Sequence, residues 1–247
     1  MMGAQGAGGM GGMRNMDWNS IGKMDQLTPQ VQRHLTKVYA ALSGALLAAV
    51  LGAYYGWKFA VTGVWTQIAL FGCILGLSMI RDVYNRLIVF HAAGFLMGCN
   101  LSPLLAMVAL HNPQLIVTAL MGTAMIFICF SLSAMYAKRR HFLYLGGMLS
   151  SAISILCTFR FLNFIMGGTM SAGLYEIELY GGLFMFMAYV IFDTQMIIED
   201  AYANRKDFVA HAMELLIDFV AIFVRLLVIL TRNAEKKRED ERRKESR

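Results

Sequence analysis

The sequence predicts an all-α fold: a polytopic membrane helix bundle of six transmembrane helices plus a seventh, partly polar C-terminal membrane helix. Of its 247 residues, 57% are hydrophobic and only 15% are charged, and the mean hydropathy is +0.54. These values exclude an ordinary soluble domain. Apolar stretches of about 20 residues recur, which is the length of a membrane-crossing helix and twice that of a membrane β-strand. A helical bundle therefore follows.

The expected crossing segments succeed one another with short polar connections. In chain order they lie near residues 38–57, 59–80, 87–110, 115–137, 142–166, 177–198 and 208–231. Before them, residues 28–39 predict a short amphipathic helix at the membrane interface, with Pro29 near its start. We accordingly expect a disordered, Gly- and Met-rich tail at 1–27, one membrane domain at 28–231 and a charged cytosolic tail at 232–247.

The distribution of Lys and Arg predicts the orientation. The short loops at residues 81–86 and 138–141 are basic, as is the stretch before the first crossing, so the N-terminus is expected in the cytosol. A full seventh crossing would put eight Lys and Arg, from Arg232 onward, on the far side. Either the last segment dips in and returns, or it crosses as a shielded central helix. We favour the first alternative and a cytosolic C-terminus.

Small residues and cysteines inside the apolar segments indicate packing rather than chemistry. Gly72 with Gly76, and Gly94 with Gly98, have the GxxxG spacing that lets helix backbones approach closely. The four cysteines all lie in apolar segments without a CxxC spacing, so we expect core thiols and neither a disulfide nor a zinc site.

The last two crossings carry ionisable residues where apolar ones are expected. Asp193 interrupts the first arm, and the second carries His211, Glu214, Asp218 and Arg225. At about 100° per residue, the four positions on the second arm fall within roughly 60° of one another and share one stripe. Ionisable groups within a membrane segment are candidate functional sites by default.

Counting outward from the polar turn near residues 203–206 places Asp193 and Asp218 at similar depths on antiparallel arms. Two carboxylates at low dielectric cannot both be charged at little cost, so the pair should share a proton or bind a cation. The alternative is that Asp193 caps a frayed helix end and Asp218 pairs only with Arg225. His211 is a rival pH sensor, because imidazole titrates near neutrality.

Several longer stretches carry a resemblance. They are GFLMGCNLSPLL (94–105), TALMGTAMIFICFSLSAMYAKRR (118–140), LGGMLSSA (145–152), FDTQMIIE (192–199) and IDFVAIFVRLL (217–227). Over residues 30–235 the chain resembles the transmembrane Bax inhibitor motif family, and within it the Bax inhibitor branch.

The resemblance implies an endoplasmic-reticulum membrane protein that restrains cell death and lets calcium leak from the store in a pH-sensitive way. It also implies that Asp193 and Asp218 form the pH and cation sensor, and hence the tentative calcium ligands. In relatives, an arginine binds one aspartate of the pair and holds the protein closed, as a latch. The candidates for that latch here are Arg86 and Arg81, with Arg225 as a third.

Two functions of different classes follow: a calcium leak gated by protonation, and a scaffold that suppresses death by binding other membrane proteins without conducting ions. An intramembrane aspartyl protease is disfavoured, because its Gly-x-Gly-Asp context is replaced by FDTQ and LIDF, and no other catalytic motif is present. We therefore expect no enzyme and no cofactor. The expected partners are calcium ions, membrane lipids and apoptosis-regulating membrane proteins, and not nucleic acid, because the cations lie in loops and at the C-terminus.

Overall fold

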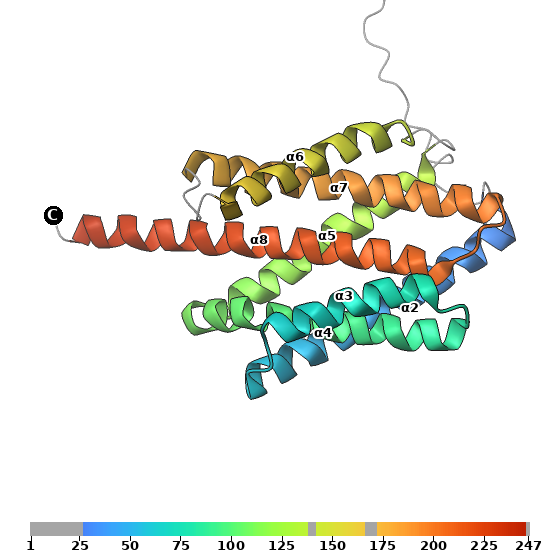
Figure 1. Cartoon of the computed structure of the whole chain (residues 1–247). Coiled ribbons are helices and arrows are strands. Elements are labelled where there is room, and N and C mark those ends of the chain that lie inside the picture. The colour runs from blue at the N-terminus through green and yellow to red at the C-terminus, as the bar shows by residue number, and fades with distance from the viewer. Residues whose placement is uncertain (1–26, 138–141, 166–171, 246–247) are drawn as a thin grey trace, which may run out of the picture.

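A computed structural model describes residues 27–137, 142–165 and 172–245, and within these ranges the chain is all-α (Figure 1). The prediction of an all-helical membrane bundle is thereby confirmed. The basic loop at 138–141 and residues 1–26 of the expected disordered tail lie outside the described residues. The helices are α2 (Pro29–Phe59), α3 (Val64–Met79), α4 (Val83–His111), α5 (Gln114–Tyr136), α6 (Leu145–Ile165), α7 (Ala172–Tyr202) and α8 (Phe208–Glu245).

Five of the described helices, α2, α4, α5, α6 and α7, are long and apolar enough to cross a membrane. The helix α3 is equally apolar but has only 16 residues. The last helix, α8, contains the polar arm predicted at 208–231 and continues without a break to Glu245. The described part of the predicted charged tail is thus a helical extension of α8.

The first predicted feature requires a correction. Residues 28–39 do not form a separate interfacial helix, because α2 begins at Pro29 and runs unbroken to Phe59. The apolar face of its first turns, with Val31, Leu35 and Val38, is fully or almost fully buried in the main core. That core also contains residues of α7 and α8, and burial against them holds the segment inside the bundle.

Close packing of α2 on α4 depends on glycines. A Cβ added to Gly98 would collide with the carbonyl oxygen of Ala49, and one added to Gly94 would lie 2.7 Å from that of Ala45. The GxxxG prediction therefore holds for this pair. It is wrong for Gly72 and Gly76, where an added Cβ meets nothing within 4 Å, because that face of α3 has no helix against it.

The cysteines also differ in environment. All four are free, and Cys99 is buried and donates to the carbonyl of Gly52 at 3.2 Å. Cys129 and Cys157 are exposed on the outer surface of the protein, so the prediction of core thiols is wrong for these two.

The helix α8 occupies the centre of the bundle. It runs between the α6–α7 pair and the group of α2, α3 and α4, with α5 crossing behind it (Figure 1), and it contacts α2, α4, α5 and α7. Leu215, Leu216 and Ile222 of α8 are completely buried. The observed position of α8 therefore agrees with the second alternative, a shielded central helix, and not with the favoured one.

The path of α8 overturns the favoured re-entrant alternative. Arg232 pairs with Glu176 at the start of α7, at 3.2 Å, and Arg238 donates to the carbonyl of His111 at the end of α4. The end of α8 thus lies opposite the start of α2 (Figure 1).

Candidate functional site

Two carboxyl groups meet between α7 and α8. Asp218 is only 3% exposed, and its side chain shares a hydrogen bond with that of Asp193. A carboxylate has no proton to donate, so this hydrogen bond requires one of the two groups to be protonated. The second oxygen of Asp218, Oδ2, is buried without a hydrogen-bond partner. The structure thus brings together the two aspartates that the sequence analysis singled out.

Other polar groups surround this pair. The charge of Glu214 on α8 acts on Asp218, and the charges of both aspartates act in turn on Tyr189 of α7. The hydroxyls of Tyr39 and Ser131 lie beside that of Thr194, the residue after Asp193, and all three hydroxyl oxygens are buried without a satisfactory hydrogen bond. Unpartnered oxygens in a protein interior are the usual ligands of ordered water or of a cation.

These oxygens are fewer than a bound calcium ion requires. Calcium takes six to eight oxygen ligands in proteins. Among the described residues, no three His, Cys, Asp or Glu side chains gather closely enough to hold a metal ion. The two carboxyl groups supply only part of a calcium shell, and water would have to supply the rest.

The expected single stripe on α8 is divided among three environments, which corrects the prediction. Only His211 and Asp218 are buried. Glu214 is exposed and lines a cavity of about 560 Å³ beside α3. Arg225 lies 4.5 Å from the ring centre of Phe186 and donates to a backbone carbonyl on its own helix. The alternative pairing of Asp218 with Arg225 is therefore not present.

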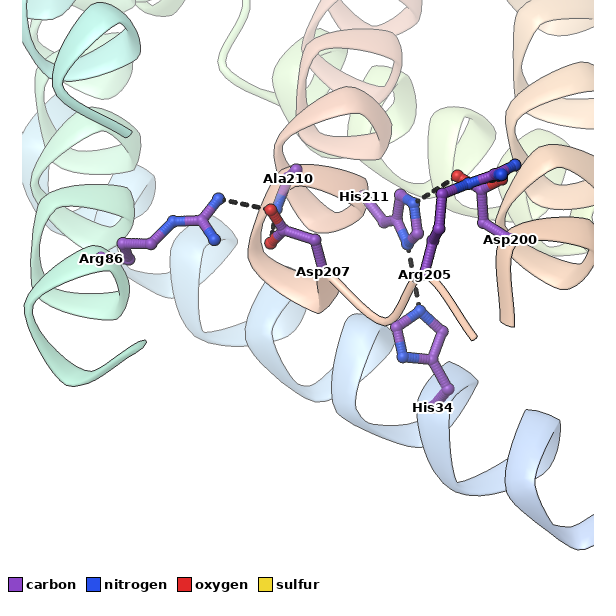
Figure 2. Close-up of polar contacts among 7 residues, drawn as sticks. All are labelled: His34, Arg86, Asp200, Arg205, Asp207, Ala210 and His211. Carbon is purple, nitrogen blue, oxygen red and sulfur yellow. Dashed lines mark hydrogen bonds and ion pairs between the residues drawn. The ribbon is translucent and has the colours of Figure 1, made fainter. Parts of the chain in front are cut away.

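His211 belongs to a second cluster near the α7–α8 turn (Figure 2). Its Nδ1 lies 3.0 Å from Nε2 of His34 on α2, and its Nε2 lies 3.4 Å from a carboxylate oxygen of Asp200 on α7. Asp200 also accepts from Arg205 in the turn. This cluster ties α2, α7 and α8 together at the end of the bundle where α2 begins.

The latch candidates have other contacts. Arg86 at the start of α4 pairs with Asp207, whose carboxylate lies at 2.7 Å and also accepts from the amide of Ala210 in the first turn of α8 (Figure 2). Partial burial alone would raise the pKa of Asp207, but the hydrogen bonds from Arg86 and Ala210 hold this pKa below its usual value. Arg81 is exposed and lines the same cavity as Glu214. Within the described residues, no arginine forms an ion pair with Asp193 or Asp218.

Sequence reasoning missed several buried polar residues. Glu178 on α7 is 5% exposed and pairs with Arg160 of α6. It lies in an apolar run just as Asp193 does, so the same criterion would have found it. His34 offered no such signal, because it sits in a segment whose alternating polar residues indicate an exposed helix.

The fold and this site define a class: polytopic helical membrane proteins with a carboxyl pair on two adjacent helices. Comparison with known proteins identifies the family to which the chain belongs. The family described as "Inhibitor of apoptosis-promoting Bax1" matches residues 31–235, and the chain belongs to this family.

Similar curated proteins cover nearly the whole chain. "Bax inhibitor 1" of Arabidopsis thaliana is 39% identical over 228 residues, which are 92% of this chain and 92% of that protein. "Bax inhibitor 1" of Rattus norvegicus is 37% identical over 235 residues, or 93% of this chain and 98% of that protein. The resemblance found in the sequence motifs is therefore confirmed at the level of the family.

Proposed function

We propose that this protein is an endoplasmic-reticulum membrane protein that restrains cell death, and that it passes calcium through the bundle under control of the Asp193–Asp218 pair. The observation that carries the proposal is the hydrogen bond between these two carboxyl groups inside a helix bundle. Membership of a family named for inhibition of an apoptosis-promoting protein supports the first part. The names of the curated relatives support it too.

The pair links protons to cation affinity by simple electrostatics. With one proton shared, the pair carries a single negative charge and a fixed geometry. Loss of that proton leaves two facing carboxylates, which repel one another and attract a divalent cation. Protons and calcium therefore compete for the same oxygens, and the ion flux through the bundle depends on pH.

The direct test is calcium flux from liposomes that contain only the purified protein. We expect Asp193→Asn combined with Asp218→Asn to abolish flux above the lipid background. The matched control is Asp82→Asn, which changes a carboxylate that caps α4 on the surface. Asparagine also caps helices well, so the control should conduct like the wild type. Flux that survives the double substitution rejects a calcium path through this pair.

A second function is favoured by the helical extension of α8. Residues 235–245 are exposed and densely charged, which suits the docking of another protein without any ion conduction. Deletion of residues 235–247 would then remove death suppression, while the double aspartate substitution would leave it intact. The opposite pattern in a cell-survival assay would favour the calcium path.

A further inference from the structure

A cavity of about 560 Å³ opens between the end of α3 and the beginning of α8. It lies at the end of the bundle where α2 begins, outside the carboxyl pair described above. Its walls combine apolar side chains with charges of both signs, among them Leu77, Ile80, Arg81, Arg86, Asp207 and Glu214. Its volume is within the range of binding sites for small molecules and headgroups.

Because α3 is short and apolar on its outer face, lipid acyl chains can reach this cavity. Its 16 residues span about 24 Å, whereas the hydrocarbon core of a bilayer is about 30 Å thick. The outer face of α3 is apolar and exposed, with Phe71, Leu75 and Met79 at 67%, 65% and 82%. Acyl chains that cover this face lead directly to the cavity, where α3 ends at Met79 and Arg81 follows.

The charged groups in the cavity suit a ligand that carries both a negative and a positive charge. Arg81 is exposed at the rim. Arg86 uses Nη2 for Asp207, and its side chain is 16% exposed. These two guanidinium groups offer donors to a phosphate, and the exposed carboxylate of Glu214 offers acceptors to an ammonium. A purely anionic ligand would face the carboxylate of Glu214 without compensation.

We propose that this cavity binds the headgroup of phosphatidylethanolamine. The phosphate contacts Arg81 and Arg86, the primary ammonium contacts Glu214, and the acyl chains lie along the exposed face of α3. Phosphatidylcholine lacks the N–H donors that Glu214 would accept, and phosphatidylglycerol lacks the cation. Recognition of both charges distinguishes this site from the general attraction of basic loops to anionic lipid.

The test is native mass spectrometry of the purified full-length protein in detergent, with equal amounts of the three phospholipids added. We expect phosphatidylethanolamine to be retained about fivefold or more over the other two. Glu214→Gln should remove that preference, and Arg81→Gln should lower the retention of all three lipids. The matched control is Arg33→Gln, which changes an exposed arginine at a different cavity, beside the start of α2.

Arg81 and Glu214 are exposed, so their substitution should leave the bundle folded, and thermal unfolding of each variant checks this. Equal retention of the three lipids would overturn the proposal. Retention of phosphatidylglycerol at the level of phosphatidylethanolamine would also overturn it, since Glu214 would then play no part. The binding assay needs no ion flux, so its outcome is independent of the calcium proposal.

Discussion

His34 and His211 are 177 positions apart in sequence, yet their ring nitrogens Nε2 and Nδ1 lie 3.0 Å apart. The rings are nearly perpendicular, at 89°, and both residues are buried. This hydrogen bond fastens the first described helix to the last. It requires one ring to donate and the other to accept, so both rings cannot be protonated while it exists.

Removal of one imidazole should weaken the bundle. In His34→Ala, His211 loses its partner on α2 while it remains buried, which should lower the free energy of unfolding by about 1–3 kcal/mol. Thr36→Ala is the control, because Thr36 is exposed on the same helix and bonds only to the carbonyl of Gln32. Thermal unfolding in detergent measures both variants. Equal stability of the two would show that the histidine contact contributes nothing.

The two glycine pairs should respond in opposite ways. Gly98→Ala places a methyl group against the backbone of Ala49, which cannot move aside as a side chain could, so we expect a loss of about 1–3 kcal/mol. Gly72→Ala meets no atom within 4 Å and improves helix propensity, so it should be neutral or stabilising by up to about 1 kcal/mol. Chemical denaturation in mixed micelles distinguishes them. A destabilised Gly72→Ala would indicate an unrecognised neighbour of α3.

The Arg86–Asp207 contact predicts a stability that depends on pH. The folded-state pKa of Asp207 is lowered, so its stabilisation is complete above the unfolded-state value near 4 and is lost as pH falls through the folded-state value. Asp207→Asn keeps a helix cap but loses the charge, and should unfold about 1–3 °C below wild type at pH 7. Once the pH falls below the folded-state pKa of Asp207, the two should converge. A constant difference across this range would contradict the assignment.

The Asp218→Asn variant tests whether the pH response depends on a proton shared by the two carboxyl groups. The amide preserves the shape and can donate permanently to Asp193, so no proton needs to be shared. We expect calcium flux in liposomes to lose its variation with pH in this variant. His211→Gln tests the rival sensor and should retain the variation. The reverse result would transfer the pH response to the histidine cluster and leave the aspartates as a cation site alone.

The continuous path of α8 predicts that residue 27 and the end of α8 lie on opposite sides of the membrane. Short epitope tags at each end can be compared by protease protection in sealed microsomes. One tag should be cleaved without detergent and the other only after detergent is added. Cleavage of both tags in sealed vesicles would contradict this prediction and support the re-entrant arrangement.

The bundle and the aspartate pair could be predicted because both depend on local properties of the sequence. Segment length and hydropathy define the helices, and the distance of Asp193 and Asp218 from a common turn sets their depth. Contacts between distant helices have no such local signal. The same GxxxG spacing occurs at Gly72 and at Gly94, but only the second faces another helix.

The partners of the arginines were unpredictable for the same reason. Arg86 is 121 positions from Asp207, and only the packing of α4 against α8 brings them together. Arg225 shares a helical face with Asp218, but the two residues lie two turns apart along α8. The guanidinium of Arg225 contacts the aromatic ring of Phe186 instead.

An unbroken α8 acts as a mechanical lever about 57 Å long. Helices are stiff along their axes, so an axial shift or tilt that begins where Asp218 separates from Asp193 is transmitted to residues 232–245 with little loss. The ion pairs of Glu176 with Arg232 and Lys236 lie on that route and would be strained by the same movement. If the pair acts as proposed, its protonation state would change the position of the charged residues 232–245.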